Sequence, residues 1–118
     1  MAYRTREPTK YGNRKVFYNG ICFDSKREMM RYQELRMLEK AGEIRDLQLQ
    51  VRYGLIPSQY VNGKLKERAI NYVADFTYRD KDNNLVVEDV KSEATKTELY
   101  VAKRKMMLYF HGIIIHEV

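Results

Sequence analysis

Two strand-like segments joined by a polar turn constrain the fold of this chain more than any other feature. Residues 69–79 and 85–91 are rich in strand-forming side chains, and the five residues between them, 80–84, read DKDNN. Aspartate and asparagine favour turns because their side chains hydrogen-bond to the nearby backbone. The pattern therefore predicts that the two segments form an antiparallel hairpin.

The first part of the chain has the pattern of a short hairpin followed by a helix. Residues 16–18 and 21–23 flank Asn19 and Gly20, a pair that suits a tight hairpin turn because both residues tolerate positive φ angles. Apolar residues then recur at helical spacing, which predicts a helix over about 25–41.

A long alternating segment follows the predicted helix. Residues 44–56 alternate between apolar and polar side chains like a half-buried strand, and Pro57 ends the alternation. One face of this strand is expected to carry Leu47, Leu49, Val51, Tyr53 and Leu55. Residues 58–67 are rich in polar residues and are expected to form a turn or loop.

The C-terminal part reads as a helix and a last strand. Thr95 and Glu98 have the spacing of a capping box, and apolar residues continue at helical spacing as far as His111 and Gly112. The apolar start of residues 113–118 predicts a strand covered on both faces.

These elements predict an α/β fold with a mixed sheet. Their order is a short β-hairpin followed by α, β, β, β, α, β, with the second helix as a right-handed crossover between parallel strands. We expect residues 16–118 to form a single domain and residues 1–15 to form a flexible basic arm. A merely solubilising tail is the alternative for those first fifteen residues.

Composition narrows the class of protein. The 118 residues include 22 Lys and Arg against 16 Asp and Glu, a net charge of +6, with 44% hydrophobic residues. This composition supports a folded core and excludes a disordered polycation. No apolar run approaches the ~20 residues of a membrane-spanning helix, and we expect no membrane partner. A single cysteine, Cys22, and a start without an apolar signal segment predict a reducing cytosol.

Two aspartates are predicted to face each other across the central hairpin. If the turn has the five residues 80–84, Asp75 stands directly opposite Asp89, with Cβ atoms ~5 Å apart. Such a pair can share a divalent cation and is destabilising without one. Lys91 follows two residues after Asp89 on the same face, where it can stabilise developing negative charge. A simple salt-bridged cluster is the alternative for these three residues.

Glu28 is a further candidate on the first predicted helix. Its spacing to Tyr32 and Leu35 places it on the core side of that helix, near the N-terminus. The alternative is purely structural, because Ser25 and Glu28 also have the spacing of a capping box.

The predicted order and these residues resemble the PD-(D/E)xK, or restriction-endonuclease-like, nuclease superfamily. The matching signature is Ala74-Asp75 and Asp89-Val90-Lys91, with Glu28 as the acid of the first helix. Ala74 stands where the superfamily has its name-giving proline. The segments FDSKREMMRYQELRMLEKAGEI, YVADFTYRD and VVEDVKS further resemble small phage and prophage nucleases similar to Holliday-junction resolvases, over about residues 11–118.

The resemblance implies a magnesium-dependent endonuclease, with manganese as a substitute metal. Asp75, Asp89 and the Val90 carbonyl would hold the metal, and Glu28 would complete its shell through a water molecule. Lys91 would orient the attacking water, and cleavage would leave a 5′-phosphate and a 3′-hydroxyl. The implied substrate is branched or structured DNA, and a homodimer is implied because the two strands of a junction need two active sites.

Basic residues on the N-terminal arm and the second helix are expected to neutralise DNA phosphates without reading bases. The residues expected to contact DNA are Arg4, Arg6, Lys10, Arg14, Lys15, Gln50, Lys96, Lys103, Arg104 and Lys105. The alternatives to a resolvase are a catalytically silent DNA-binding accessory protein and a nonspecific nickase in phage DNA processing. A phage-encoded enzyme would act in the cytosol of its host.

Overall fold

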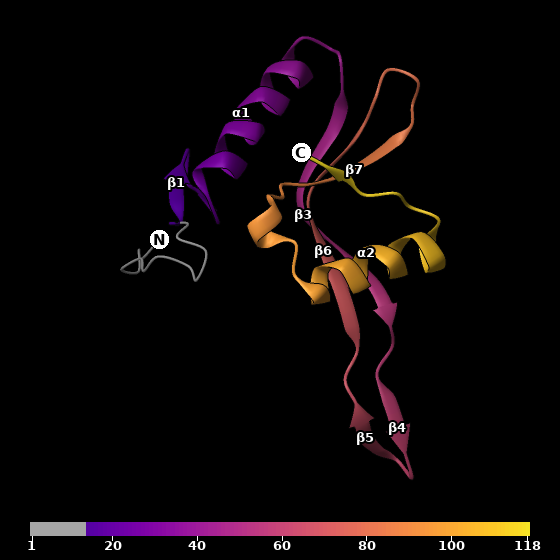
Figure 1. The fold of residues 1–118 in the computed structure, drawn as a ribbon. Helices are drawn as coiled ribbons and strands as arrows, with labels where there is room; N and C mark the ends of the chain where they lie inside the picture. The colour runs from indigo at the N-terminus through magenta and orange to yellow at the C-terminus, as the bar shows by residue number, and fades with distance from the viewer. Residues whose placement is uncertain (1–13) are drawn as a thin grey trace.

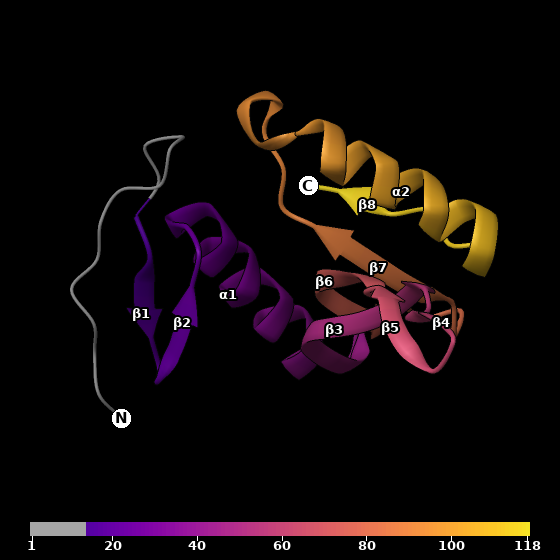
Figure 2. The same cartoon turned by 90° about the horizontal axis from the view of Figure 1, so that it is seen from below.

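A mixed four-stranded sheet with helices on both faces forms the body of the protein (Figures 1 and 2). The structure is a computed structural model that describes residues 14–118. The strands lie in the order β3 (Arg45–Ile56), β6 (Ile70–Arg79), β7 (Leu85–Asp89) and β8 (His116–Glu117). The pairs β3–β6 and β6–β7 are antiparallel, and β7–β8 is parallel. The predicted mixed fold and its order of elements are confirmed.

The first helix and the N-terminal hairpin pack together, as the sequence predicts. Strands β1 (Val16–Tyr18) and β2 (Ile21–Phe23) pair across a turn at Asn19 and Gly20, which both have positive φ. Helix α1 (Lys26–Lys40) begins after Ser25, whose hydroxyl accepts a hydrogen bond from the Glu28 backbone N–H at 3.1 Å. The N-cap half of the predicted capping box is therefore present.

Two apolar cores lie on opposite faces of the sheet, one under each helix. The core under α1 contains Tyr32 and Leu35 of the helix and Phe76 of β6. The core under α2 (Glu98–His111) contains Tyr100 and Met107 of that helix. Successive residues of β7 alternate between the two faces, so the strand buries side chains on both sides.

Strand β3 passes from one core to the other along its length, which the sequence prediction missed. Leu47 and Leu49 pack against the α1 core, whereas Tyr53 and Leu55 belong to the α2 core. The expected alternation is confirmed, because the less exposed residues are Leu47, Leu49, Val51, Tyr53 and Leu55, but these side chains pack into two cores rather than one. Gln50 lies between these two groups of residues and has a left-handed φ of 54°.

Three further details differ from the sequence predictions. The last strand is limited to His116–Glu117, and Ile114 is 78% exposed, so residues 113–118 are not a strand covered on both faces. The second helix begins at Glu98 with Thr97 as its N-cap. Thr95 is instead the last residue of a short 3-10 helix, η1 (Glu93–Thr95), and it forms a capping box with Ser92 rather than with Glu98.

Residues 58–67 form a hairpin rather than a loop. Strands β4 (Gln59–Val61) and β5 (Lys64–Glu67) pair with each other in a separate two-stranded sheet inserted between β3 and β6. Asn62 and Gly63 both have positive φ, which is the requirement of a tight hairpin turn. Among residues 14–118, neither helix is long and apolar enough to cross a membrane.

Candidate active site

The register of the central hairpin brings Asp75 and Asp89 together. Arg79 pairs with Leu85 and Phe76 pairs with Glu88, as the five-residue turn predicts. The next position in this register sets Asp75 opposite Asp89. Asp89 is 3% exposed at the end of β7. The backbone thus places two carboxylates side by side near the middle of β6.

Each aspartate has defined hydrogen-bond partners. Asp75 Oδ2 accepts a hydrogen bond from the Val90 backbone N–H at 2.8 Å, and the Tyr72 hydroxyl donates to Asp89 Oδ2. Lys91 Nζ lies 3.0 Å from Asp89 Oδ1. These contacts orient both carboxylates and bring the lysine to the pair, as the alternation of side chains along β7 predicts.

Glu28 reaches the same place from α1. Its side chain is 5% exposed, and Gln50 Nε2 donates a hydrogen bond to Glu28 Oε1 across 3.5 Å. The Glu28 backbone N–H donates to the helix cap, while the charge of its side chain interacts with those of Asp89 and Asp75. Only the backbone of Glu28 serves the cap, so its side chain stays a candidate for the site.

The electrostatics of Glu28 and Asp75 show that the carboxylates are crowded. Burial raises the pKa of Glu28 to about 7, with further increases from the charges of Asp24 and Asp89. Burial also raises the pKa of Asp75, and the charges of Asp89 and Glu28 add to this increase. Buried like charges favour protonation or a compensating cation. We define Glu28, Asp75, Asp89 and Lys91 as the carboxylate site.

Lys91 is held between the aspartate pair and α2. Its Nζ lies 4.4 Å from the centre of the Tyr100 ring, a cation–π contact, and its side chain is 19% exposed. Its backbone N–H donates to the Val118 carbonyl at 3.0 Å, which ties the segment after β7 to the C-terminal end. The ammonium group is thus positioned by contacts on both sides.

A second network borders the carboxylate site on the α2 side. Glu117 pairs with Asp89 in the parallel register of β7 and β8. The Tyr100 hydroxyl and Arg104 donate to Glu117 at 2.6 and 2.9 Å, and Lys96 lies 3.3 Å from its other oxygen. Hydrogen bonds from Tyr100, Arg104 and Lys96 lower the pKa of Glu117 to about 2.

The donor set of the site suits a hard divalent cation such as magnesium. Asp75 and Asp89 offer carboxylate oxygens, and magnesium in proteins is commonly held by one or two carboxylates together with water and substrate phosphate. No ready-made group of three or more His, Cys, Asp and Glu with metal-ligand geometry occurs in the described residues. Val90, whose carbonyl was the expected ligand, contacts Asp75 through its backbone N–H.

The residues expected to contact DNA are distributed unevenly. Gln50 lies at the carboxylate site, and Lys96 and Arg104 border it through Glu117. Lys103 and Lys105 lie farther along α2. Arg14 is exposed, and Lys15 lies 3.8 Å from Asp24. The predicted arm residues Arg4, Arg6 and Lys10 fall outside the described residues.

Sequence reasoning missed two cations and two tyrosines. Exposed Lys26 and Arg27, at the start of α1, line a hollow of about 550 Å³ together with Val90, which follows Asp89. The sequence did contain a signal for these cations, because Lys26 and Arg27 directly precede the candidate acid Glu28. Tyr72 and Tyr100 had no such signal, because their roles depend on which strand and helix the fold sets beside Asp89 and Lys91.

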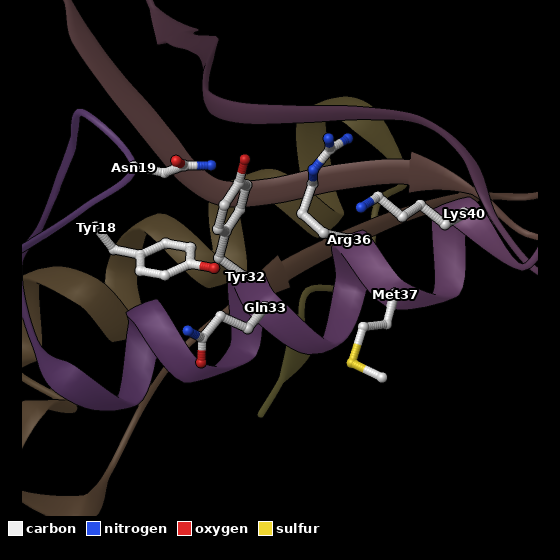
Figure 3. A pocket seen from close by; sticks show the side chains of 7 residues that line it. All are labelled: Tyr18, Asn19, Tyr32, Gln33, Arg36, Met37 and Lys40. Atoms are coloured by element: carbon white, nitrogen blue, oxygen red, sulfur yellow. The ribbon is translucent and has the colours of Figure 1, made fainter.

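A separate hollow lies between α1 and the β1–β2 turn (Figure 3). Its volume is about 350 Å³. Arg36 and Lys40 contribute its positive charge, and Arg36 is paired with Glu39 at 2.6 Å. None of its lining residues is a carboxylate, so this hollow is distinct from the carboxylate site.

The fold and the site together define a small mixed α+β protein with buried carboxylates beside a lysine. A family described as "protein of unknown function (DUF1064)" matches residues 8–115. The chain therefore belongs to this family. No curated protein matches the chain, and no solved structure matches it.

Proposed function

We propose that the protein is a metal-dependent endodeoxyribonuclease of the PD-(D/E)xK type that hydrolyses phosphodiester bonds in branched or structured DNA. One observation carries this proposal. Three carboxylates from three different elements, Glu28, Asp75 and Asp89, converge beside Lys91, although burying like charges weakens the fold. Such crowding is typical of sites that are built for chemistry rather than for stability.

Each residue of the carboxylate site has a role in this proposal. Asp75 and Asp89 would hold magnesium, which supplies a Lewis acid and an acidified water when bound. Lys91 would orient the attacking water and stabilise the charge that develops on the phosphate. Glu28, held by Gln50, would accept a proton or a hydrogen bond from a water molecule on the α1 side.

The surroundings of the site support a nucleic-acid substrate. Lys26 and Arg27 line the same hollow as Val90. The chain as a whole has a net charge of +6. Cations around a phosphodiesterase site contact phosphates and give salt-dependent binding. Because phosphate contacts carry no sequence information, recognition would depend on DNA shape. We further propose a homodimer for two-strand cleavage, and the cytosol as the location.

The direct test is cleavage of three labelled DNAs: a four-way junction, a linear duplex of the same sequence and a supercoiled plasmid. Each is incubated with magnesium, manganese or a chelator. Wild type is compared with Asp89→Asn and with Asp82→Asn, a matched change in the exposed β6–β7 turn. We expect metal-dependent cleavage that Asp89→Asn lowers by ~100-fold or more and that Asp82→Asn retains.

The pattern of substrates then distinguishes the alternatives. Preference for the junction supports a resolvase, and equal nicking of all three DNAs supports a nonspecific nickase. Tight binding without cleavage by wild type would overturn the catalytic proposal and leave a DNA-binding accessory protein. A circular dichroism spectrum of Asp89→Asn that matches wild type confirms that loss of activity is not loss of fold.

A further inference from the structure

The β4–β5 hairpin projects from the body of the protein as a narrow arm (Figure 1). All residues of Gln59–Val61 and Lys64–Glu67 are exposed, and the two strands form a sheet of their own. The Ser58 hydroxyl accepts a hydrogen bond from the Ala69 backbone N–H at 3.2 Å, which joins the arm to the end of the β3–β6 pair. The arm is thus an extension of the two strands that carry Gln50 and Asp75.

The arm exposes apolar side chains that are unusual on a hairpin surrounded only by water. Tyr60 pairs with Leu65 across the two strands, and these side chains are 65% and 50% exposed. Val61, opposite Lys64, is 54% exposed. An isolated two-stranded hairpin is marginally stable in water, and exposed apolar groups on it indicate a surface that a partner covers.

The charge of the arm identifies the class of partner. Exposed Lys64, Lys66 and Arg68 outnumber Glu67 on this segment. None of the salt bridges formed within residues 14–118 uses these three cations. Their charge is therefore available to a polyanion, whereas a second copy of the same arm would meet it with like charge.

The shape of the arm fits a groove of duplex DNA. A two-stranded β-ribbon enters the major groove, which is about 12 Å wide. Along the extended chain, Lys66 lies nine residues before Asp75, a reach of ~30 Å. This distance approaches the ~34 Å of one turn of the double helix.

We propose that the β4–β5 hairpin is a DNA-binding arm that lies in a groove about one helical turn from the bond at the carboxylate site. This inference rests on the proposed function. It specifies which region of the DNA substrate the arm contacts. Lys64 and Lys66 share one face of the arm and bind phosphates, whereas Tyr60 and Leu65 lie on the opposite face and cover sugars and base edges within the groove. The arm thereby makes binding depend on the length of duplex beside the cut.

The test measures DNA binding in the presence of chelator, so that no cleavage occurs. Fluorescence anisotropy is recorded with a duplex of about 10 base pairs and one of about 30, one and three helical turns. Wild type is compared with the double variant Lys64→Ala, Lys66→Ala. The control is Lys40→Ala, Lys81→Ala, which removes the same charge from the end of α1 and from the β6–β7 turn.

We expect the arm variant to lose affinity for the long duplex, with a salt slope smaller by about 2, and to bind the short duplex almost as wild type does. The control variant should keep the wild-type dependence on duplex length. The melting temperature of the arm variant should be unchanged, because its substituted residues are exposed.

Failure of this inference is distinguishable from failure of the proposed function. If wild type binds and cleaves DNA but the arm variant has the same affinity and salt slope, the arm proposal is overturned and the nuclease stands. If the arm variant changes only the oligomeric state in analytical ultracentrifugation, the arm is a contact between copies and the proposal is also overturned. If wild type neither binds nor cleaves any DNA, both proposals fail.

Discussion

At the scale of single residues, the carboxylate site places several acidic side chains together without stabilising the folded protein. Glu28 and Asp89 are almost fully buried, and Lys91 is the cation in direct contact with Asp89. Like charges on directly opposite strand residues are destabilising. The neighbouring Glu117 is the reverse case, because three donors favour its ionised form and this carboxylate stabilises the fold.

Glu117 therefore predicts a specific acid dependence of stability. Its folded pKa of about 2 lies below the ordinary value of 4.5, so its contribution is complete above pH 4.5 and is lost as the pH falls towards 2. Because the side chain is partly exposed, we expect Glu117→Gln to cost only about 1 kcal/mol of unfolding free energy at neutral pH. Denaturant titrations of both proteins should converge below pH 3; a constant difference across this range would contradict the assignment.

At the scale of elements, Gln50 of β3 combines a left-handed backbone with a contact to the site. A left-handed φ of 54° in a glutamine is a strained conformation, and it sets the side chain against Glu28. We predict that Gln50→Val destabilises the protein by ~1–3 kcal/mol, because a β-branched residue tolerates this backbone least. Gln50→Gly should be close to neutral in stability but lower the cleavage rate, and urea denaturation with a cleavage assay measures both. Equal stability of the two variants would show that the left-handed backbone at Gln50 is not strained.

A buried ion pair attaches α1 to β7 next to the site. Arg31 donates to both oxygens of Glu88 at 2.9 and 2.7 Å, and the Tyr78 hydroxyl donates to the same carboxylate, which is completely buried. Arg31 follows Glu28 by three residues and Glu88 precedes Asp89, so this pair fixes the spacing between the two acids.

Loss of one member of this pair leaves an unpaired buried charge. We predict that Arg31→Met costs ~3–5 kcal/mol of unfolding free energy, and that adding Glu88→Leu recovers most of this loss. Guanidinium denaturation of the single and double variants measures the coupling. An additive, uncompensated loss in the double variant would show that Glu88 acts mainly through packing.

How far the sequence predicts these elements depends on whether their signal is local. The turn length of 80–84 fixed the register, so Asp75 opposite Asp89 followed from the sequence. The left-handed φ of Gln50 was not predictable, because an unbroken alternation of apolar and polar residues gives no sign of it. The β4–β5 hairpin did have a signal, Asn62-Gly63, which is the same dipeptide that identified the first hairpin.

At the scale of the whole molecule, the site draws residues from both faces of the sheet. Glu28 arrives with α1 on one face of the sheet, and Lys91 rests on Tyr100 of α2 on the other. The contact of Tyr100 with Lys91 arises only after α2 has packed on the sheet, so it depends on long-range structure. The sequence therefore predicts the acids and the lysine but not the side chains that hold them.

The central claim is that Asp75 and Asp89 are held together to bind a divalent cation. The most direct measurement is the unfolding free energy of wild type and Asp75→Asn at neutral pH, in chelator and in increasing magnesium, with Asp82→Asn as control. In chelator, Asp75→Asn should be more stable than wild type by about 1 kcal/mol, because asparagine removes the free-energy cost of protonating Asp75, whose pKa is raised in the folded protein. Magnesium should stabilise wild type and Asp82→Asn but not Asp75→Asn. An equal response of all three proteins, or no response of wild type, would contradict the claim.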